Sequence, residues 1–372
     1  MTSSMFFRPA IRRYARVWAP VALLLLLVLV GCAKDYPQTT LAPKGDFARL
    51  VDHIFMTTVW WALGVFILVE GALVYAMVKF RHKPGAAEPE QTHGNTTLEI
   101  IWTVIPAAIL ALIAVPTVRA IFRTAQEPGA EALQVEVIGH QWWWEFRYPD
   151  LKIVTAGDLH VPMGQTVNLR MTTADVVHSF WIPQFAGKRD VFPRRFNNIW
   201  FKADTTGVFS GQCAEFCGVE HGRMAFRVVS DSPEEFAAWT ASQQSGSPMV
   251  NAGNVTDSAI AVAIKAANHD TSAAIDSVLA RGKAVFMAGG CIGCHAMAGT
   301  PMAGQMQLVG PNLTHVGSRH TIAAGTLPMT DENLAAWLHN PDSVKPGVLM
   351  KLPRPLTDDE VNALVAYLKL HK

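Results

Sequence analysis

The sequence predicts a multidomain fold, in which a two-helix transmembrane hairpin is followed by an all-β Greek-key sandwich and an all-α domain. Two apolar stretches, from about Ile54 to Val78 and from about Ile100 to Val118, each supply the ~20 residues that a bilayer-spanning helix needs. Between residues 124 and 235, apolar and polar residues alternate with the period of β-strands. Beyond residue 274 the apolar spacing becomes helical, which predicts a separate C-terminal domain.

Residues 1–31 have the features of an exported lipoprotein signal. Four arginines form a basic start: Arg8, Arg12, Arg13 and Arg16. The apolar run from Val21 to Val30 is too short for a comfortable membrane span and is typical of a signal peptide. Because the residues up to Cys32 match a bacterial lipobox, we expect a lipoprotein-type signal peptide, lipidation of Cys32 and a periplasmic segment at 32–52. An uncleaved first helix with an incidental cysteine is the alternative.

Basic residues flank both apolar stretches of the transmembrane hairpin, which we place at 53–123. Arg81 and Lys83 follow the first stretch and suit a cytoplasmic loop. Arg119 and Arg123 follow the second stretch and weaken the positive-inside argument. The orientation of the hairpin therefore depends on the chemistry of the domains that follow it.

A short loop concentrates soft metal ligands. Its ligand residues are Cys213, Cys217, His221 and Met224. Thiolates, imidazole and a thioether select copper over hard cations. A single blue-copper ion uses one thiolate, so two cysteines indicate two bridged coppers if another histidine arrives, and His178 can supply it. The alternatives are a disulfide in an exported protein and a thioredoxin-like copper chaperone, which usually has proline where this chain has Gly218.

This loop, together with the segment Val176–Trp181, resembles subunit II of the haem–copper cytochrome c oxidases. That family carries a binuclear copper centre, called CuA, on a cupredoxin-like Greek-key sandwich, which we place at 124–242. The resemblance implies that the two cysteines bridge the coppers. It implies that three further side chains complete the centre: His178, His221 and Met224. It also implies that Glu215 gives its backbone carbonyl to copper and its carboxylate to a Mg²⁺ ion shared with subunit I.

An aromatic cluster precedes the copper loop in the sequence His140–Tyr148. Because side chains alternate along a strand, Trp142 and Trp144 should share one face, with Trp143 on the other. The resemblance implies that Trp142 is an exposed indole through which electrons enter the copper centre. Packing in the sandwich core or at the membrane interface is the alternative for these tryptophans.

Two further positions carry expectations from the same resemblance. Glu99 lies where the family has a carboxylate beside the entrance of a proton pathway into subunit I. A carboxylate at a helix start that favours the helix dipole explains Glu99 almost as well. Arg194 stands where the family commonly has glycine, which leaves the geometry of that turn open.

The C-terminal region carries the motif Cys291-Ile292-Gly293-Cys294-His295, the Cys-x-x-Cys-His pattern of covalent c-type haem attachment. The two thiols reach the haem vinyl groups, and the histidine meets the iron. A chance occurrence and a zinc half-site are the alternatives, but zinc would need a second ligand pair at matching spacing. We therefore expect one covalent haem c.

The surrounding residues, 274–372, resemble a small class I cytochrome c domain. Gly310–Leu313 matches the family's proline loop, and Thr357–Glu360 forms a capping box that opens a last helix. Methionine is the expected sixth iron ligand, and the candidates are Met302, Met306, Met329 and Met350. The family's Lys-Pro-Gly-x-x-Met pattern favours Met350, although the usual following proline is replaced by Lys351. A flexible linker is expected at 243–273, because this segment is rich in small polar residues.

The resemblance implies a fused subunit II, in which haem c passes electrons to CuA and CuA delivers them to haem a of subunit I for oxygen reduction and proton pumping. The donor would be a soluble cytochrome c or a membrane cytochrome complex, and subunit III a further partner. Copper and haem require an oxidising compartment, so both domains should lie on the periplasmic side of a bacterial inner membrane.

Composition narrows the remaining classes of function. With 16% charged residues and a formal net charge of +1, the chain lacks the basic footprint of a nucleic-acid binder.

Three other classes of protein share some of these features. A nitrous oxide reductase shares the copper loop but needs a large histidine-rich propeller. A quinol oxidase subunit II lacks the copper ligands, and a copper-delivery lipoprotein would have no use for the haem motif. These three functions are the alternatives to a fused oxidase subunit II.

Overall fold

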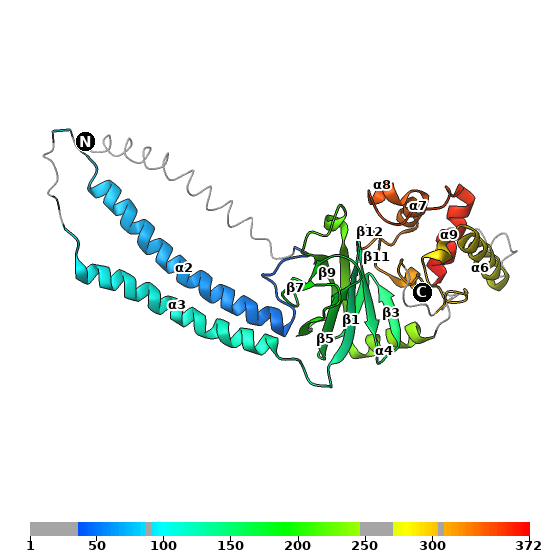
Figure 1. The fold of residues 1–372 in the computed structure, drawn as a ribbon, viewed down its shortest axis with the longest axis horizontal. Coiled ribbons are helices and arrows are strands. Elements are labelled where there is room, and N and C mark those ends of the chain that lie inside the picture. The colour runs from blue at the N-terminus through cyan, green and yellow to red at the C-terminus, as the bar shows by residue number, and fades with distance from the viewer. Residues whose placement is uncertain (1–35, 83, 86–90, 92, 246–270, 304–308) are drawn as a thin grey trace, which may run out of the picture.

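The computed structural model describes residues 36–82, 84–85, 91, 93–245, 271–303 and 309–372. Cys32, the signal peptide and most of the predicted linker lie outside these residues. A helical hairpin, a β-sandwich and a helical domain follow one another in space as they do in sequence (Figure 1). The predicted fold class is confirmed.

The hairpin consists of α2 (Asp46–Lys79) and α3 (Thr96–Ala125). Both helices are long and apolar enough to cross a membrane. They extend away from the sandwich (Figure 1). Asn95 caps α3, since its side chain accepts hydrogen bonds from the backbone N–H groups of Thr97 and Leu98.

Helix α2 begins before the apolar stretch that predicted it. The side chain of Asp46 accepts a hydrogen bond of 2.9 Å from the backbone N–H of Lys202 in the sandwich. Phe47 and Ala48 are buried, and Phe47 packs edge-on against Trp200 at a centroid distance of 6.2 Å. The 34 residues of α2 span about 51 Å, which exceeds the ~30 Å hydrocarbon core. The first turns of the helix are therefore built into the sandwich.

The sandwich is made of two five-stranded sheets with strand orders β3-β2-β1-β5-β8 and β4-β10-β9-β6-β7. The strands of the first sheet are β1 (Leu133–His140), β2 (Trp143–Tyr148), β3 (Ile153–Ala156), β5 (Thr166–Thr173) and β8 (Asn197–Lys202). Those of the second are β4 (Asp158–Pro162), β6 (His178–Trp181), β7 (Lys188–Val191), β9 (Gly207–Cys213) and β10 (Ala225–Asp231). The pairs β1–β5 and β4–β10 are parallel and the others antiparallel, which reflects crossovers between the sheets.

Aromatic side chains fill the space between the two sheets. Phe180 and Phe226 stack at a centroid distance of 4.5 Å, and Trp144 packs edge-on against both. All three are buried, so this end of the core is rigid and well packed. Helix α4 (Pro233–Gln244), which opens on a capping box at Ser232, closes the sandwich.

The C-terminal domain has α6 (Thr271–Ala288), α7 (Asp331–His339), the single turn α8 (Pro341–Val344) and α9 (Asp358–Leu370). It also contains short 3-10 turns at Cys291–Gly293 (η3) and Val316–Ser318 (η4) and a small ribbon of β11 (Thr321–Ile322) and β12 (Leu327–Pro328). Its core gathers side chains from α6, α7 and α9, including Phe286, Leu334 and Leu364. The capping box predicted at Thr357 is present.

The C-terminal domain rests directly on the sandwich (Figure 1). The backbone N–H of Ala225 donates a hydrogen bond of 2.9 Å to the carbonyl oxygen of Ala324. The backbone N–H and Nδ1 of His320 each lie 2.8 Å from Oδ2 of Asp158. The contact therefore joins β10 and β4 of the second sheet to the ribbon of the helical domain.

Candidate copper and haem sites

The side chains of the loop Cys213–Met224, the copper loop, converge with His178 in one buried cluster. Sγ of Cys213 lies 3.8 Å from Sγ of Cys217 and 3.9 Å from Nδ1 of His178. Sγ of Cys217 lies 3.7 Å from Nδ1 of His221 and 3.8 Å from Sδ of Met224. The two cysteines are free, because a disulfide would place the sulfurs about 2.05 Å apart. The structure thus brings together all five predicted copper-ligating side chains.

Two paired strands and one glycine determine this geometry. His178 begins β6 and Cys213 ends β9, which pairs with β6 through Phe180 and Cys213. The backbone N–H of Cys213 donates to the carbonyl of Met224 at 2.9 Å, so the two ends of the loop meet. Gly218 has φ +120°, and a Cβ there would lie 2.9 Å from Trp142. The loop therefore requires glycine at this position.

Asp175 orients the predicted histidine ligand. Its Oδ1 lies 2.8 Å from Nε2 of His178, which leaves Nδ1 facing the sulfur of Cys213. Burial acts to raise the pKa of Asp175, but hydrogen bonds from His178 and from the backbone N–H of Gln141 outweigh it, so the pKa is lowered. A carboxylate bonded to the far nitrogen of a metal-ligating histidine fixes the ring and its tautomer.

The thiols of Cys213 and Cys217 have very different pKa values. A hydrogen bond from the Cys217 thiol lowers the pKa of Cys213 to about 3. The same bond and the neighbouring negative charge raise the pKa of Cys217. One thiolate is therefore available at neutral pH, and a metal ion would displace the second proton. This buried set of sulfur and imidazole donors fits a soft metal such as copper.

Trp142 lies directly over the copper loop. Its indole Nε1 donates a hydrogen bond of 3.0 Å to the carbonyl oxygen of Cys217. The expectation that this indole is exposed is wrong, because only 7% of Trp142 is accessible. The copper loop and the C-terminal domain cover it. Trp144 lies in the core, and Trp143 stacks on His140 at a centroid distance of 4.1 Å.

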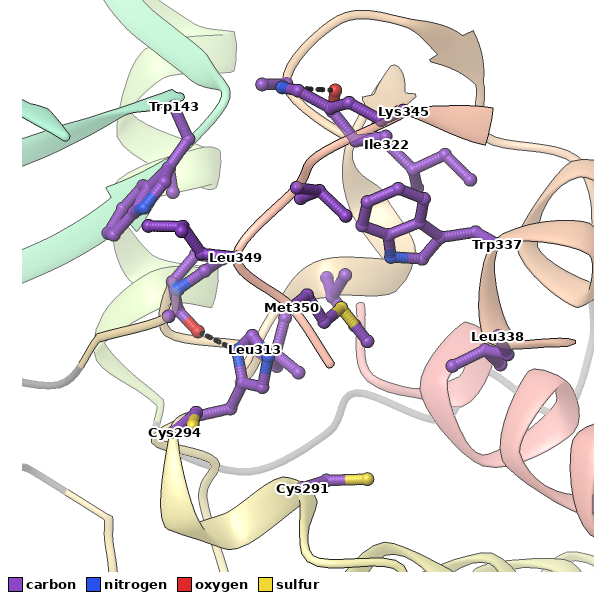
Figure 2. A pocket seen from close by; sticks show the side chains of 18 of the residues that line it. Trp143, Cys291, Cys294, Leu313, Ile322, Trp337, Leu338, Lys345, Leu349 and Met350 are labelled. Atoms are coloured by element: carbon purple, nitrogen blue, oxygen red, sulfur yellow. Dashed lines mark hydrogen bonds between the residues drawn. The ribbon is translucent and has the colours of Figure 1, made fainter. Parts of the chain in front are cut away.

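A largely apolar cavity surrounds the predicted haem-attachment motif. Cys291 and Cys294 lie at the turn η3 beneath it (Figure 2). His295 also lines the cavity. Nδ1 of His295 lies 2.9 Å from the carbonyl oxygen of Pro311, which leaves Nε2 as the ring nitrogen available to a metal. Burial lowers the pKa of His295 and so favours the neutral imidazole that a metal requires.

The cavity also matches a haem in its charge and its apolar walls. Trp337 and Leu338 line one side of it (Figure 2). The half-buried Arg319 lines the cavity, and its buried Nε has no hydrogen-bond partner among the described residues. Burial lowers the pKa of Arg319 to about 10, so it remains a cation at neutral pH. A cation beside an apolar cavity suits a flat, apolar group that carries carboxylates.

The four candidate methionines are placed differently. Met350 lines the cavity, and Figure 2 draws its side chain within it, near Leu349. Met329 packs against the core of the helical domain instead. Met302 lies in a turn and is not among the residues that line the cavity, and Met306 lies outside the described residues. The geometry is therefore consistent with Met350 as the iron ligand.

The remaining predicted residues lie apart from these sites or at their surface. Glu99 is exposed in the first turn of α3, at the end of the hairpin away from the sandwich (Figure 1). The backbone oxygen of Glu215 lies 3.3 Å from Sγ of Cys213, while its side chain is exposed. Arg194 has φ +61°, the left-handed conformation that favours glycine. The turn therefore adopts a conformation that favours glycine, although arginine occupies the position.

Sequence reasoning missed three residues of these sites: Asp175, Arg319 and Lys345. Asp175 could have been found, since it stands three residues before His178 in the same short segment. Nothing in the local sequence pattern marks Arg319 as a residue that lines the cavity. Lys345 is 2% exposed and donates hydrogen bonds to the sandwich, although lysine is rarely buried.

Models of three protein families match this chain in sequence order. The transmembrane domain of cytochrome c oxidase subunit II matches residues 41–120. The periplasmic domain of the same subunit matches residues 153–231. Cytochrome c matches residues 279–372, which includes the haem-attachment motif.

Curated relatives cover almost the whole chain. Cytochrome c oxidase subunit 2 of Alkalihalophilus pseudofirmus is 36% identical, covering 93% of this chain and 94% of the relative. Cytochrome c oxidase subunit 2 of Bacillus subtilis is 33% identical, covering 95% of this chain and 97% of the relative. The crystal structure of the periplasmic domain of subunit II of the Bradyrhizobium japonicum cytochrome oxidase is 33% identical, covers 32% of this chain and 98% of that chain, and has a TM-score of 0.31.

Proposed function

Because this chain belongs to the cytochrome c oxidase subunit II family and carries a C-terminal cytochrome c domain, we propose that it is the electron-input subunit of a respiratory oxidase. Electrons pass from haem c to the binuclear CuA centre and then to haem a of subunit I. Oxygen is reduced to water there, with coupled proton pumping. The donor is a soluble cytochrome c or a membrane cytochrome complex.

The residues described above would hold both cofactors. Two coppers would be held by His178, Cys213, Cys217, His221, Met224 and the carbonyl of Glu215. The haem would be attached through Cys291 and Cys294, and His295 and Met350 would be the protein ligands of its iron. Bound copper and haem supply one-electron transfer that needs no proton movement. The protein orients the ligands, excludes water and sets the distance between the sites.

One observation carries this proposal: the haem cavity and the copper loop share Trp142. This residue lines the cavity, and its Nε1 donates to the carbonyl oxygen of Cys217. A continuous covalent and hydrogen-bonded connection therefore runs from the cavity to a predicted copper ligand. A copper-delivery protein would have no need of such a connection.

The copper loop also offers a surface for the oxidase subunits. Phe216 and Val219 are 77% and 75% exposed, which is unusual for large apolar side chains beside a buried metal site. The exposed carboxylate of Glu215 lies beside them and is free to complete a Mg²⁺ site with a neighbouring chain. We assign this surface to subunit I, and we propose subunit III as a further partner.

The membrane anchor determines which side each domain occupies. The two helices of the hairpin support a membrane-anchored chain. We propose the bacterial inner membrane, with the copper and haem domains on the periplasmic side and Glu99 at the cytoplasmic entrance of a proton pathway. Lipidation of Cys32 would add a second anchor.

Metal analysis of the full chain in detergent tests the proposal. We expect two coppers and one haem per chain, with an electron paramagnetic resonance signal from one unpaired electron shared by both coppers. The absorption spectrum should contain the bands of a c-type haem. One copper per chain without haem would instead support copper delivery, and haem without copper a plain membrane cytochrome.

A further inference from the structure

Lys345 carries a buried ammonium from the C-terminal domain into the sandwich. Its side chain follows the single-turn helix α8, and only 2% of the residue is exposed. Its Nζ donates to the carbonyl oxygens of Arg223 and Trp142 at 2.7 and 2.8 Å, and a third contact reaches that of Ala323 at 3.4 Å. Because an ammonium has three N–H donors, each of them meets a carbonyl oxygen.

The two carbonyls in the sandwich belong to the electron-transfer machinery proposed above. Trp142 covers the copper loop and bonds to Cys217. Arg223 lies within the copper loop, immediately before Met224. Lys345 also begins the segment that ends at Met350 in the haem cavity. One side chain therefore joins the segment of the predicted haem ligand to the loop of the predicted copper ligands.

The charge of Lys345 is balanced from the sandwich side. Glu220 in the copper loop is 4% exposed, and its Oε2 has no hydrogen-bond partner among the described residues. Its carboxylate favours the charged form of Lys345, against the cost of burying an ammonium. Oε1 of Glu220 also lies 3.2 Å from Nη1 of Arg223, so Glu220 would keep a partner if the domains separated. The carbonyl oxygens of Trp142 and Arg223 would instead lose the hydrogen bonds that Lys345 donates.

Backbone hydrogen bonds and the side-chain pair of His320 and Asp158 form the rest of the contact. Ala225 donates its N–H to the carbonyl of Ala324, and His320 donates its N–H to the carboxylate of Asp158. Gly347, at φ +84°, approaches Val219 so closely that a Cβ would lie 2.9 Å away. These contacts give shape complementarity, whereas the side chain of Lys345 donates hydrogen bonds that fix the position of one domain on the other.

We propose that Lys345 is a positioning residue that holds the haem domain over Trp142. In this position the tethered haem faces the copper site, and an external cytochrome cannot reach that site. This inference rests on the proposed function. An external donor then reduces ferric haem c by one electron, and the same electron passes to oxidised CuA, with no proton transferred. Direct reduction of CuA by the external donor is blocked while the domain is docked.

Labelling of the wild-type chain with an amine-reactive acetylating reagent tests the buried ammonium directly. We expect Lys345 to react at least about tenfold more slowly than Lys283, which is exposed on α6. The readout is mass spectrometry of the full chain in detergent, and it needs neither cofactor nor activity. Equal reactivity of the two lysines would overturn the proposal.

A matched pair of variants, Lys345→Met and Lys283→Met, tests the consequence. Hydrogen–deuterium exchange at the N–H groups of Ala225 and His320, which bond across the contact, should be at least about tenfold faster in Lys345→Met only. The N–H of Leu334, bonded to Thr330 inside the haem domain, should keep its protection. Wild-type protection at Ala225 and His320 in a folded Lys345→Met chain would contradict the proposal.

Two electron-transfer measurements complete the test in the oxidase complex. In Lys345→Met, transfer from haem c to CuA after photoreduction should slow at least about tenfold, with unchanged haem and copper spectra. Reduced external cytochrome c should gain direct reduction of CuA. Absence of copper or haem in the wild-type chain would refute the proposed function, yet the labelling and exchange results would still decide the docking. If Lys345→Met does not fold, the labelling of the wild-type chain decides alone.

Discussion

Oδ1 of Asp175 lies 2.8 Å from Nε2 of His178 and thereby directs the other ring nitrogen towards the two cysteines. The bond joins a half-exposed carboxylate to a fully buried imidazole. The orientation of this predicted copper ligand is therefore set before any metal binds. Ligands oriented in this way lose less conformational freedom on binding.

The Asp175→Asn substitution should weaken copper binding, because the amide orients the imidazole less firmly and no longer stabilises its basic form. Affinity should fall by about 10–100-fold, the usual effect of losing such a partner. Competition with a copper chelator measures it. Asp150→Asn, in an exposed turn, is the matched control and should bind copper as the wild type does. Equal affinities in the two variants would remove Asp175 from this role.

The Trp142→Phe substitution should slow electron transfer into copper while leaving copper and haem content intact. It removes the hydrogen bond from Nε1 to the carbonyl oxygen of Cys217, which should also lower the free energy of unfolding by about 1 kcal/mol. Flash photolysis and thermal unfolding measure the two effects. Trp200→Phe is the control, because Nε1 of Trp200 is buried without a hydrogen-bond partner among the described residues. Normal transfer in Trp142→Phe would reduce this residue to a packing role.

The Met350→Ala substitution should abolish the methionine–iron charge-transfer band of the haem, because Met350 lines the cavity. Met329→Ala should keep the band and lower stability instead, by about 1–2 kcal/mol, since Met329 is a partly buried side chain against the core. Absorption spectroscopy of the oxidised chain distinguishes the two. A band that survives in Met350→Ala would assign the iron to another ligand.

Docking of the haem domain should weaken as the pH rises above neutrality. The hydrogen bond that Asp158 accepts from the imidazole raises the pKa of His320, against the opposing effect of burial. Asp231 also raises this pKa and Arg227 lowers it. Because the docked pKa exceeds the undocked one, the ion pair contributes fully below the undocked value, about 6.5. The contribution is lost as the pH rises through the docked pKa.

Exchange at the N–H of Ala225, corrected for its intrinsic pH dependence, follows this change in docking. The His320→Asn variant should lose the part of the dependence near neutrality. It separates this titration from that of Lys345, whose pKa burial lowers to about 8. A pH profile of the variant identical to that of the wild type would contradict the assignment.

Local patterns in the sequence predicted the parts of the molecule that local patterns determine. Apolar length marked both spanning helices, and ligand spacing marked the Cys213–Met224 loop and the haem motif. The outcome differed where tertiary contacts decide. The indole of Trp142 is buried because the C-terminal domain lies over it. Lys345 is buried because backbone carbonyl oxygens of the sandwich accept its hydrogen bonds. No periodicity within a single segment carries such information.

The first turns of α2 are built into the sandwich, through Asp46, Phe47 and Ala48. A change in the direction of this helix would therefore also change the orientation of the sandwich. Over the helix length of about 51 Å, a change of about 5° in helix tilt shifts the end at the sandwich by about 4 Å relative to the far end. Tilting is one way in which a helix longer than the hydrocarbon core adapts to the thickness of the bilayer. The thickness of the membrane would thus affect the height and angle at which the copper loop is held above the bilayer.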